Sequence, residues 1–134
     1  RLTDDEHKGG FYMAPTIIED ARPSDAISRD ELFGPITCLY RVKGFTEAVE
    51  LVNDSPFGLT AAIHTKNMHR AMTFMNEVKT GVISINGATY GSEPHMPFGG
   101  LGQSGTGWRE AGTEALDVYS DWKTVYIVHD PTDV

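Results

Sequence analysis

Residues 59–86 read LTAAIHTKNMHRAMTFMNEVKTGVISIN, and this stretch predicts a strand, a helix and a second strand in succession. Its two ends, 59–64 and 82–86, are short and mostly apolar, as strands are. Between them apolar residues recur at helical spacing after Asn67, which is a favoured helix cap. We expect Gly81 to close this helix and its apolar face to pack in the core, through Met68, Ala71, Met72, Met75 and Val78.

The residues before this stretch repeat the same pattern. Alternation over 36–42 predicts a strand that places Ile36, Cys38, Tyr40 and Val42 on one face. A helix capped by Thr46 should follow and stop at Ser55-Pro56. Sixteen residues, 43–58, separate the first two strands, which suits a parallel crossover. The sequence therefore predicts an α/β fold built on a parallel β-α-β-α-β unit.

Composition limits the partners and the compartment. The 134 residues fit one domain, and a net charge of −8 argues against a nucleic-acid or anionic-membrane surface. We find no apolar run of the roughly 18 residues that a membrane span needs. The single cysteine, Cys38, indicates a reducing, cytoplasmic compartment. A first residue of Arg1 suggests a piece of a longer protein.

The glycine-rich run 97–110 permits two interpretations. Gly100 to Gly105 match the G-x-G-x-x-G pattern, which would allow an independent nucleotide-binding domain. That fingerprint works directly after a strand and before a helix, whereas here Pro94 and Pro97 precede it. We therefore favour a tightly routed connector. The irregular stretch of about twenty residues after Asn86 is long enough to predict a functional or partner surface.

Few residues are candidates for chemistry. Cys38 could be a nucleophile, but its strand position favours a small core residue. The five histidines show no metal-ligand spacing, so we expect no metal site. His95 stays a candidate because it lies in the irregular loop beside Glu93. Glu31, with Phe33 two residues later, could hold sugar hydroxyls while the ring packs on a flat base, although a solvated turn fits equally well.

The C-terminal part predicts a helix over 110–122 and a strongly β-prone strand over 124–128. Because no partner strand follows it in the sequence, this strand would be an exposed edge suited to association.

Three segments together resemble the aldehyde dehydrogenase superfamily. Residues 30–35 (DELFGP) are similar to its E-x-F-G-P motif, and residues 53–59 (NDSPFGL) are similar to N-x-x-x-[YF]-G-L. Residues 97–110 (PFGGLGQSGTGWRE) resemble P-F-G-G-x-K-x-S-G-x-G-R-E, with Gly102 in place of the usual lysine and Trp108 as an extra residue. Order and spacing agree over about residues 10–128. Residues 21–28 and 91–100 are similar to members that act on small semialdehydes.

The resemblance implies NAD(P)-dependent oxidation of an aldehyde or semialdehyde to a carboxylic acid. Residues 1–121 would be the C-terminal part of the catalytic domain, and 122–134 the oligomerisation strand and tail. Glu31 and Phe33 match the residues that contact the nicotinamide-ribose end of NAD or NADP. Glu93, His95 and Phe98 fall in the loop at the aldehyde entrance. Residues 124–128 match the strand that extends a neighbouring subunit's sheet.

The catalytic part of this family lies upstream of the segments found here. Its nucleophilic cysteine, general-base glutamate and dinucleotide-binding half all precede the E-x-F-G-P motif, and Cys38 follows that motif. The resemblance therefore assigns no catalytic residue to these 134 residues. We expect the chain alone to be inactive and to bind no cofactor tightly. The alternative is a non-catalytic association module that oligomerises through 124–128.

Overall fold

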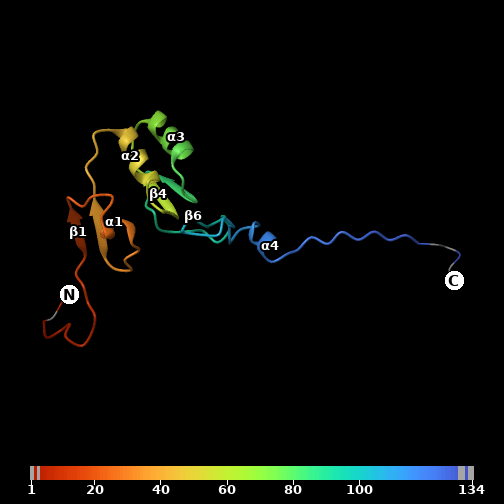
Figure 1. Cartoon of the computed structure of the whole chain (residues 1–134), viewed down its shortest axis with the longest axis horizontal. Helices are drawn as coiled ribbons and strands as arrows, with labels where there is room; N and C mark the ends of the chain where they lie inside the picture. The colour runs from red at the N-terminus through yellow and green to blue at the C-terminus, as the bar shows by residue number, and fades with distance from the viewer. Residues whose placement is uncertain (1, 3, 130–131, 133–134) are drawn as a thin grey trace.

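The computed structural model of the chain describes residues 2, 4–129 and 132 (Figure 1). Two α/β parts lie beside each other, one formed by residues near the N-terminus and one by the middle of the chain (Figure 1). The chain then passes through the glycine-rich turns into a long extended segment that leads away from both parts (Figure 1). None of the helices in the described part of the chain has the length and apolar character needed to span a bilayer.

The middle part confirms the predicted strand, helix and strand. Strand β4 (Thr60–Ile63) and strand β5 (Val82–Ile85) pair in parallel, with Thr60 opposite Val82. Helix α3 (Met68–Glu77) connects them, and the Asn67 side chain accepts a hydrogen bond from the Arg70 amide at 3.1 Å. A parallel pair needs such a crossover because the chain must return to the same end of the sheet.

Gly81 does not close this helix, so that prediction is wrong. The helix ends at Glu77, and Val78 follows in extended conformation. Gly81 lies further along, directly before β5, where a Cβ atom would stand 1.6 Å from the carbonyl oxygen of Gly99. Glycine is required there by the close approach of another backbone segment, since any side chain would occupy the same space.

The core also differs from the prediction in one respect. Buried apolar residues come from the helix before β4, from β4, and from α3 and the residue that follows it. They are Val49, Ala61, Ala71, Phe74 and Val78. Met68, Met72 and Met75 were expected in this core but are 74%, 45% and 43% exposed. The face of α3 that packs inward is centred on Ala71 and Phe74, so the methionines lie on its flank.

Helix α2 (Phe45–Asn53) packs against α3 and also begins differently from the prediction. Its N-cap is Gly44, while Thr46 lies inside the helix. At its other end the Asn53 amide donates to the carbonyl oxygen of Glu77 at 2.9 Å. The Asn53 side-chain oxygen accepts the Lys79 amide at 2.8 Å. One side chain thus joins the C-terminal ends of both helices.

The N-terminal part contains strand β1 (Thr16–Glu19), helix α1 (Ala26–Arg29) and strand β2 (Ile36–Leu39). The strands pair in parallel, with Thr16 opposite Ile36. The predicted strand over 36–42 is therefore real but ends at Leu39, and its pairing partner is β1. Ile36, Cys38 and Tyr40 share one half-buried face as predicted, whereas Val42 is exposed. The fold is mixed α/β with parallel strand pairs.

The glycine-rich segment is held by short antiparallel pairings. Strand β3 (Phe57–Gly58) pairs with strand β6 (Leu101–Gly102), and Phe98 forms an isolated bridge with Glu110. Helix α4 covers only Ala115–Val118, so the helix predicted over 110–122 is largely wrong. Ala111 and Gly112 have φ angles of 65° and 66°, and this left-handed conformation prevents a helix from starting at Glu110.

Candidate functional site

The loop 30–35, between α1 and β2, presents two of the predicted site residues to solvent. Phe33 is 97% exposed, although burying a phenylalanine ring is worth about 1.5–3 kcal/mol. Glu31 is also exposed, and its carboxylate takes part in no hydrogen bond or ion pair within the described residues. An aromatic ring and an unpaired carboxylate on one loop form a surface suited to a ligand.

Glu31 borders a recess of about 470 Å³. The recess lies between α1, the end of α2 and the strands of the middle part, and its lining includes Glu31, Gly58, Leu59, Thr60, Thr80 and Ser104. Phe33 is not among the lining residues, so the structure brings only one member of the predicted pair to this recess.

The chemistry of these side chains suits a ligand with neighbouring hydroxyl groups. An ionised carboxylate is an acceptor with two oxygens, so Glu31 can receive hydrogen bonds from two neighbouring hydroxyls. The exposed ring of Phe33 offers a flat apolar surface two residues away. A carboxylate and a flat apolar ring two residues apart can together hold a ligand that carries neighbouring hydroxyls beside a planar group.

The predicted entrance residues lie on the loop after β5. Glu93 and His95 are exposed, and the amide of Met96 donates to the Glu93 carbonyl at 3.0 Å, which forms a turn. Phe98 is half-buried and exchanges two backbone hydrogen bonds with Glu110, at 2.8 and 2.9 Å. The loop is thus held at its C-terminal end.

A second recess, of about 490 Å³, connects this loop to the sheet. Its lining comes from β4, β5 and the loop, and includes Leu59, Thr60, Ser84, residues 88–92 and Phe98. Glu93 and His95 do not line it. Leu59 and Thr60 line both recesses, so ligands on the Glu31 side and on the Phe98 side would share one wall.

The glycine turn has the geometry of a connector. Gly100 folds onto Ser104, where a Cβ on Gly100 would stand 2.5 Å from the Ser104 carbonyl oxygen. Leu101 and Gly102 pair with β3, and the next described helix begins only at Ala115. A phosphate cradle needs a helix N-terminus directly behind the glycines, and the described residues provide none at this turn.

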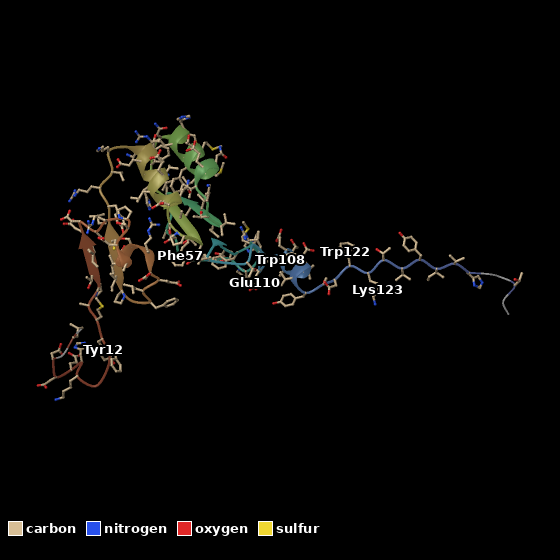
Figure 2. All side chains as sticks on the ribbon, in the orientation of Figure 1. Tyr12, Phe57, Trp108, Glu110, Trp122 and Lys123 are labelled. Atoms are coloured by element: carbon tan, nitrogen blue, oxygen red, sulfur yellow. The ribbon has the colours of Figure 1, made fainter. Side chains whose placement is uncertain are left out.

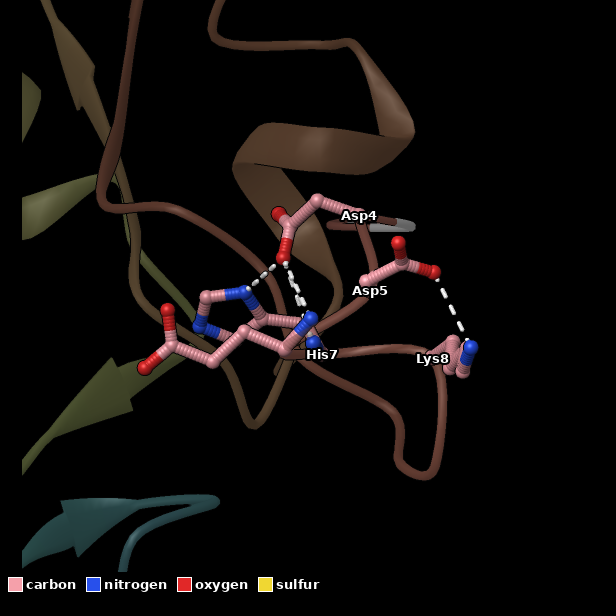
Figure 3. A network of polar contacts seen from close by, with 5 residues as sticks. Asp4, Asp5, His7 and Lys8 are labelled. Carbon is pink, nitrogen blue, oxygen red and sulfur yellow. Dashed lines mark hydrogen bonds and ion pairs between the residues drawn. The ribbon is translucent and has the colours of Figure 1, made fainter.

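A network of polar contacts near the N-terminus joins residues within the stretch 4–8 (Figure 3). The Asp4 carboxylate lies 2.7 Å from Nδ1 of His7, and Lys8 forms an ion pair with Asp5 (Figure 3). The side-chain hydrogen bond with His7 lowers the pKa of the Asp4 carboxyl below its ordinary value. Asp4, Glu6 and His7 bring atoms of the kind that ligate metals within 4.8 Å of one another. The backbone amides of Glu6 and His7 donate hydrogen bonds to the Asp4 carboxylate, and these bonds account for the turn over residues 4–7.

Residues 124–128 are extended and form no strand ladder with the described part of the chain. Side chains on both faces are exposed, with Val125 at 65%, Tyr126 at 90%, Ile127 at 85% and Val128 at 96%. Trp122 and Lys123 lie on the extended stretch between the end of α4 at Val118 and this segment (Figure 2). Pairing of 124–128 with a strand of another subunit therefore stays a prediction.

Known proteins match this chain over most of its length. The sequence profile of the Aldehyde dehydrogenase family matches residues 2–125. An alpha-ketoglutaric semialdehyde dehydrogenase of Bacillus subtilis is 35% identical over 95% of the chain, and an alpha-ketoglutarate semialdehyde dehydrogenase of Haloferax volcanii is 40% identical over 87%. These alignments cover 26% and 24% of the two relatives, so the chain spans about a quarter of their length.

The fold also matches solved structures over most of this chain and about a quarter of theirs. A betaine aldehyde dehydrogenase from Staphylococcus aureus, solved in complex with NAD+, superposes with a TM-score of 0.82 at 35% identity. The match covers 89% of this chain and 23% of that one. PnpE from a Pseudomonas species gives a TM-score of 0.80 at 38% identity, over 88% and 24% of the two chains. The chain therefore belongs to the aldehyde dehydrogenase family.

Proposed function

We propose that this chain is the C-terminal part of an NAD(P)-dependent aldehyde dehydrogenase, and that it supplies the ribose contact and the substrate entrance to an active site completed by upstream residues. The observation that carries the proposal is the loop 30–35, where Glu31 is unpaired within the described residues and Phe33 is 97% exposed. Glu31 binds the ribose hydroxyls, and Phe33 packs near the nicotinamide.

The substrate is an aldehyde or semialdehyde that enters past Glu93, His95 and Phe98. Support comes from the half-buried Phe98, which lines the second recess, and from the names of the semialdehyde dehydrogenases to which the chain is similar. The 134 residues contain a single cysteine, Cys38, which suits a reducing compartment, so we place the complete enzyme in the cytoplasm.

The purified chain alone is expected to produce no NAD(P)H from aldehydes. Nucleophile, base and dinucleotide-binding half belong to the upstream part of the family, so the bond-making step is missing. An absorbance assay for NAD(P)H with a panel of aldehydes and semialdehydes checks this. A steady rate that survives Cys38→Ser, which removes the only cysteine, would contradict the proposal.

In the complete dehydrogenase, Glu31→Gln should raise KM for the cofactor about ten- to a hundredfold. The substitution keeps the size of the side chain but removes the negative charge that strengthens the two hydrogen bonds from the ribose hydroxyls. A hydrogen bond to a charged group contributes about 1.5–3 kcal/mol, and part of this is lost with the charge. Glu93→Gln is the matched control, since it removes the same charge at the entrance and should alter KM for the aldehyde instead. An unchanged KM for the cofactor in Glu31→Gln would exclude the ribose contact.

A second candidate function is a non-catalytic association module that pairs with itself or with a full-length subunit. The observation that favours it is the exposed apolar segment 124–128, whose backbone pairs with no strand of the described residues and is suited to adding a strand to another sheet.

A further inference from the structure

Ser104 joins the glycine turn to the recess that Glu31 borders. Its side-chain oxygen accepts a hydrogen bond from the amide of Gly58 at 3.1 Å, across 46 residues of sequence. Gly58 is buried, and its carbonyl oxygen accepts the amide of Gly81 at 3.0 Å. Both backbone groups of Gly58 are therefore bonded, and Ser104 provides one of the two partners.

The backbone of Ser104 is itself fixed. Its amide donates to the carbonyl of Leu101 at 3.1 Å, and Gly100 lies so close that a Cβ there would contact the Ser104 backbone at 2.5 Å. A hydroxyl on this turn is consequently presented at a defined position. Loss of the hydroxyl would leave a buried amide without a partner, which costs about 1–3 kcal/mol.

Glu31, Gly58 and Ser104 line the same recess. We propose that Ser104 is a positioning residue for cofactor binding: by holding the amide of Gly58, it fixes the wall of the recess that faces Glu31. This inference rests on the proposed function, because it takes the recess as the ribose site. The Ser104 hydroxyl acts through Gly58 and needs no contact with the cofactor.

The test uses the complete dehydrogenase and measures NAD+ binding by calorimetry, together with hydrogen exchange of the Gly58 amide. Ser104→Ala should weaken NAD+ binding about five- to thirtyfold and speed exchange at Gly58, while the Kd for a substrate-analogue carboxylate stays within about twofold. Ser104→Thr, which keeps the hydroxyl, should restore both readouts. Gln103→Ala, at the neighbouring exposed position, is the matched control and should leave both unchanged.

Each other outcome has a separate meaning. If Glu31→Gln weakens NAD+ binding but Ser104→Ala does not, the role of Ser104 is overturned and the proposed function stands. If Ser104→Ala lowers thermal stability and weakens both ligands equally, the residue is merely structural and the inference is also overturned. If Glu31→Gln leaves NAD+ binding unchanged, the proposed function fails, and the inference fails with it.

Discussion

Gly81→Ala is expected to destabilise the chain by about 3 kcal/mol or more, enough to remove its cooperative unfolding transition. The added Cβ would stand 1.6 Å from the Gly99 carbonyl oxygen and 2.7 Å from its carbon. Both are backbone atoms, so no rotamer change can relieve the overlap, and such overpacking belongs to the severe class of substitutions. Urea unfolding followed by circular dichroism measures the effect.

Gly44→Ala is the control for this substitution. Gly44 also adjoins a regular element, but a Cβ there would meet nothing within 4 Å, and its φ of −173° is accessible to alanine. The free energy of unfolding should change by less than about 1 kcal/mol, the usual range for exchanges at a helix cap. Equal stability of the Gly81→Ala and wild-type chains would show that 99–100 does not pass over Gly81.

The prediction for Gly81 shows how far sequence reasoning reaches. Its local signal, a glycine after a helical stretch, is that of a helix end, and the two strands and the helix around it were predicted correctly. The true reason for the glycine is the passage of Gly99, which lies 18 residues later in the chain and follows a turn with no periodic signal. Contacts of this kind leave no trace in local spacing.

The same limit explains the elements that were placed wrongly. Ala111 adopts a φ of 65°, which alanine seldom does, so nothing in the sequence warned that a helix could not start at Glu110. Strand β2 pairs with β1, which has four residues and directly follows Pro15. A strand this short beside a proline gives little alternation by which the sequence could reveal it. Periodicity identifies a strand but does not identify its neighbour.

The sequence marked some of the residues at the two recesses and not others, because motifs are local and the remaining residues reach the recesses through long-range contacts. Motifs mark Glu31 and Phe98, and the structure places each at a recess, while their roles in binding stay predictions. Leu59, Thr60 and Ser104 also line these recesses, and the sequence reasoning did not single them out. Leu59 and Thr60 look like ordinary strand residues, and the role of Ser104 depends on a hydrogen bond to Gly58 across 46 residues. The serine of the glycine-rich segment was the one available signal.

Replacing Val125 and Ile127 together by lysine should weaken self-association of the chain by at least about a hundredfold. The two residues are 65% and 85% exposed, and alternation puts them on one face of any strand that 124–128 forms. Covering each side chain in a partner's sheet would contribute about 1.5–3 kcal/mol, which the charged lysines would lose. Light scattering over a concentration series gives the molar mass before and after the change.

The control pair is Met68→Lys and Met72→Lys, which adds the same charge to a different exposed apolar surface, on α3. This pair should leave the molar mass unchanged, because helix α3 offers side chains alone while 124–128 also offers unpaired backbone groups, and these give a strand its affinity for a sheet edge. Dissociation by the methionine pair alone would place the interface on α3. A monomeric wild-type chain would exclude self-association through 124–128, and pairing with a full-length subunit would be the one form of the association module left.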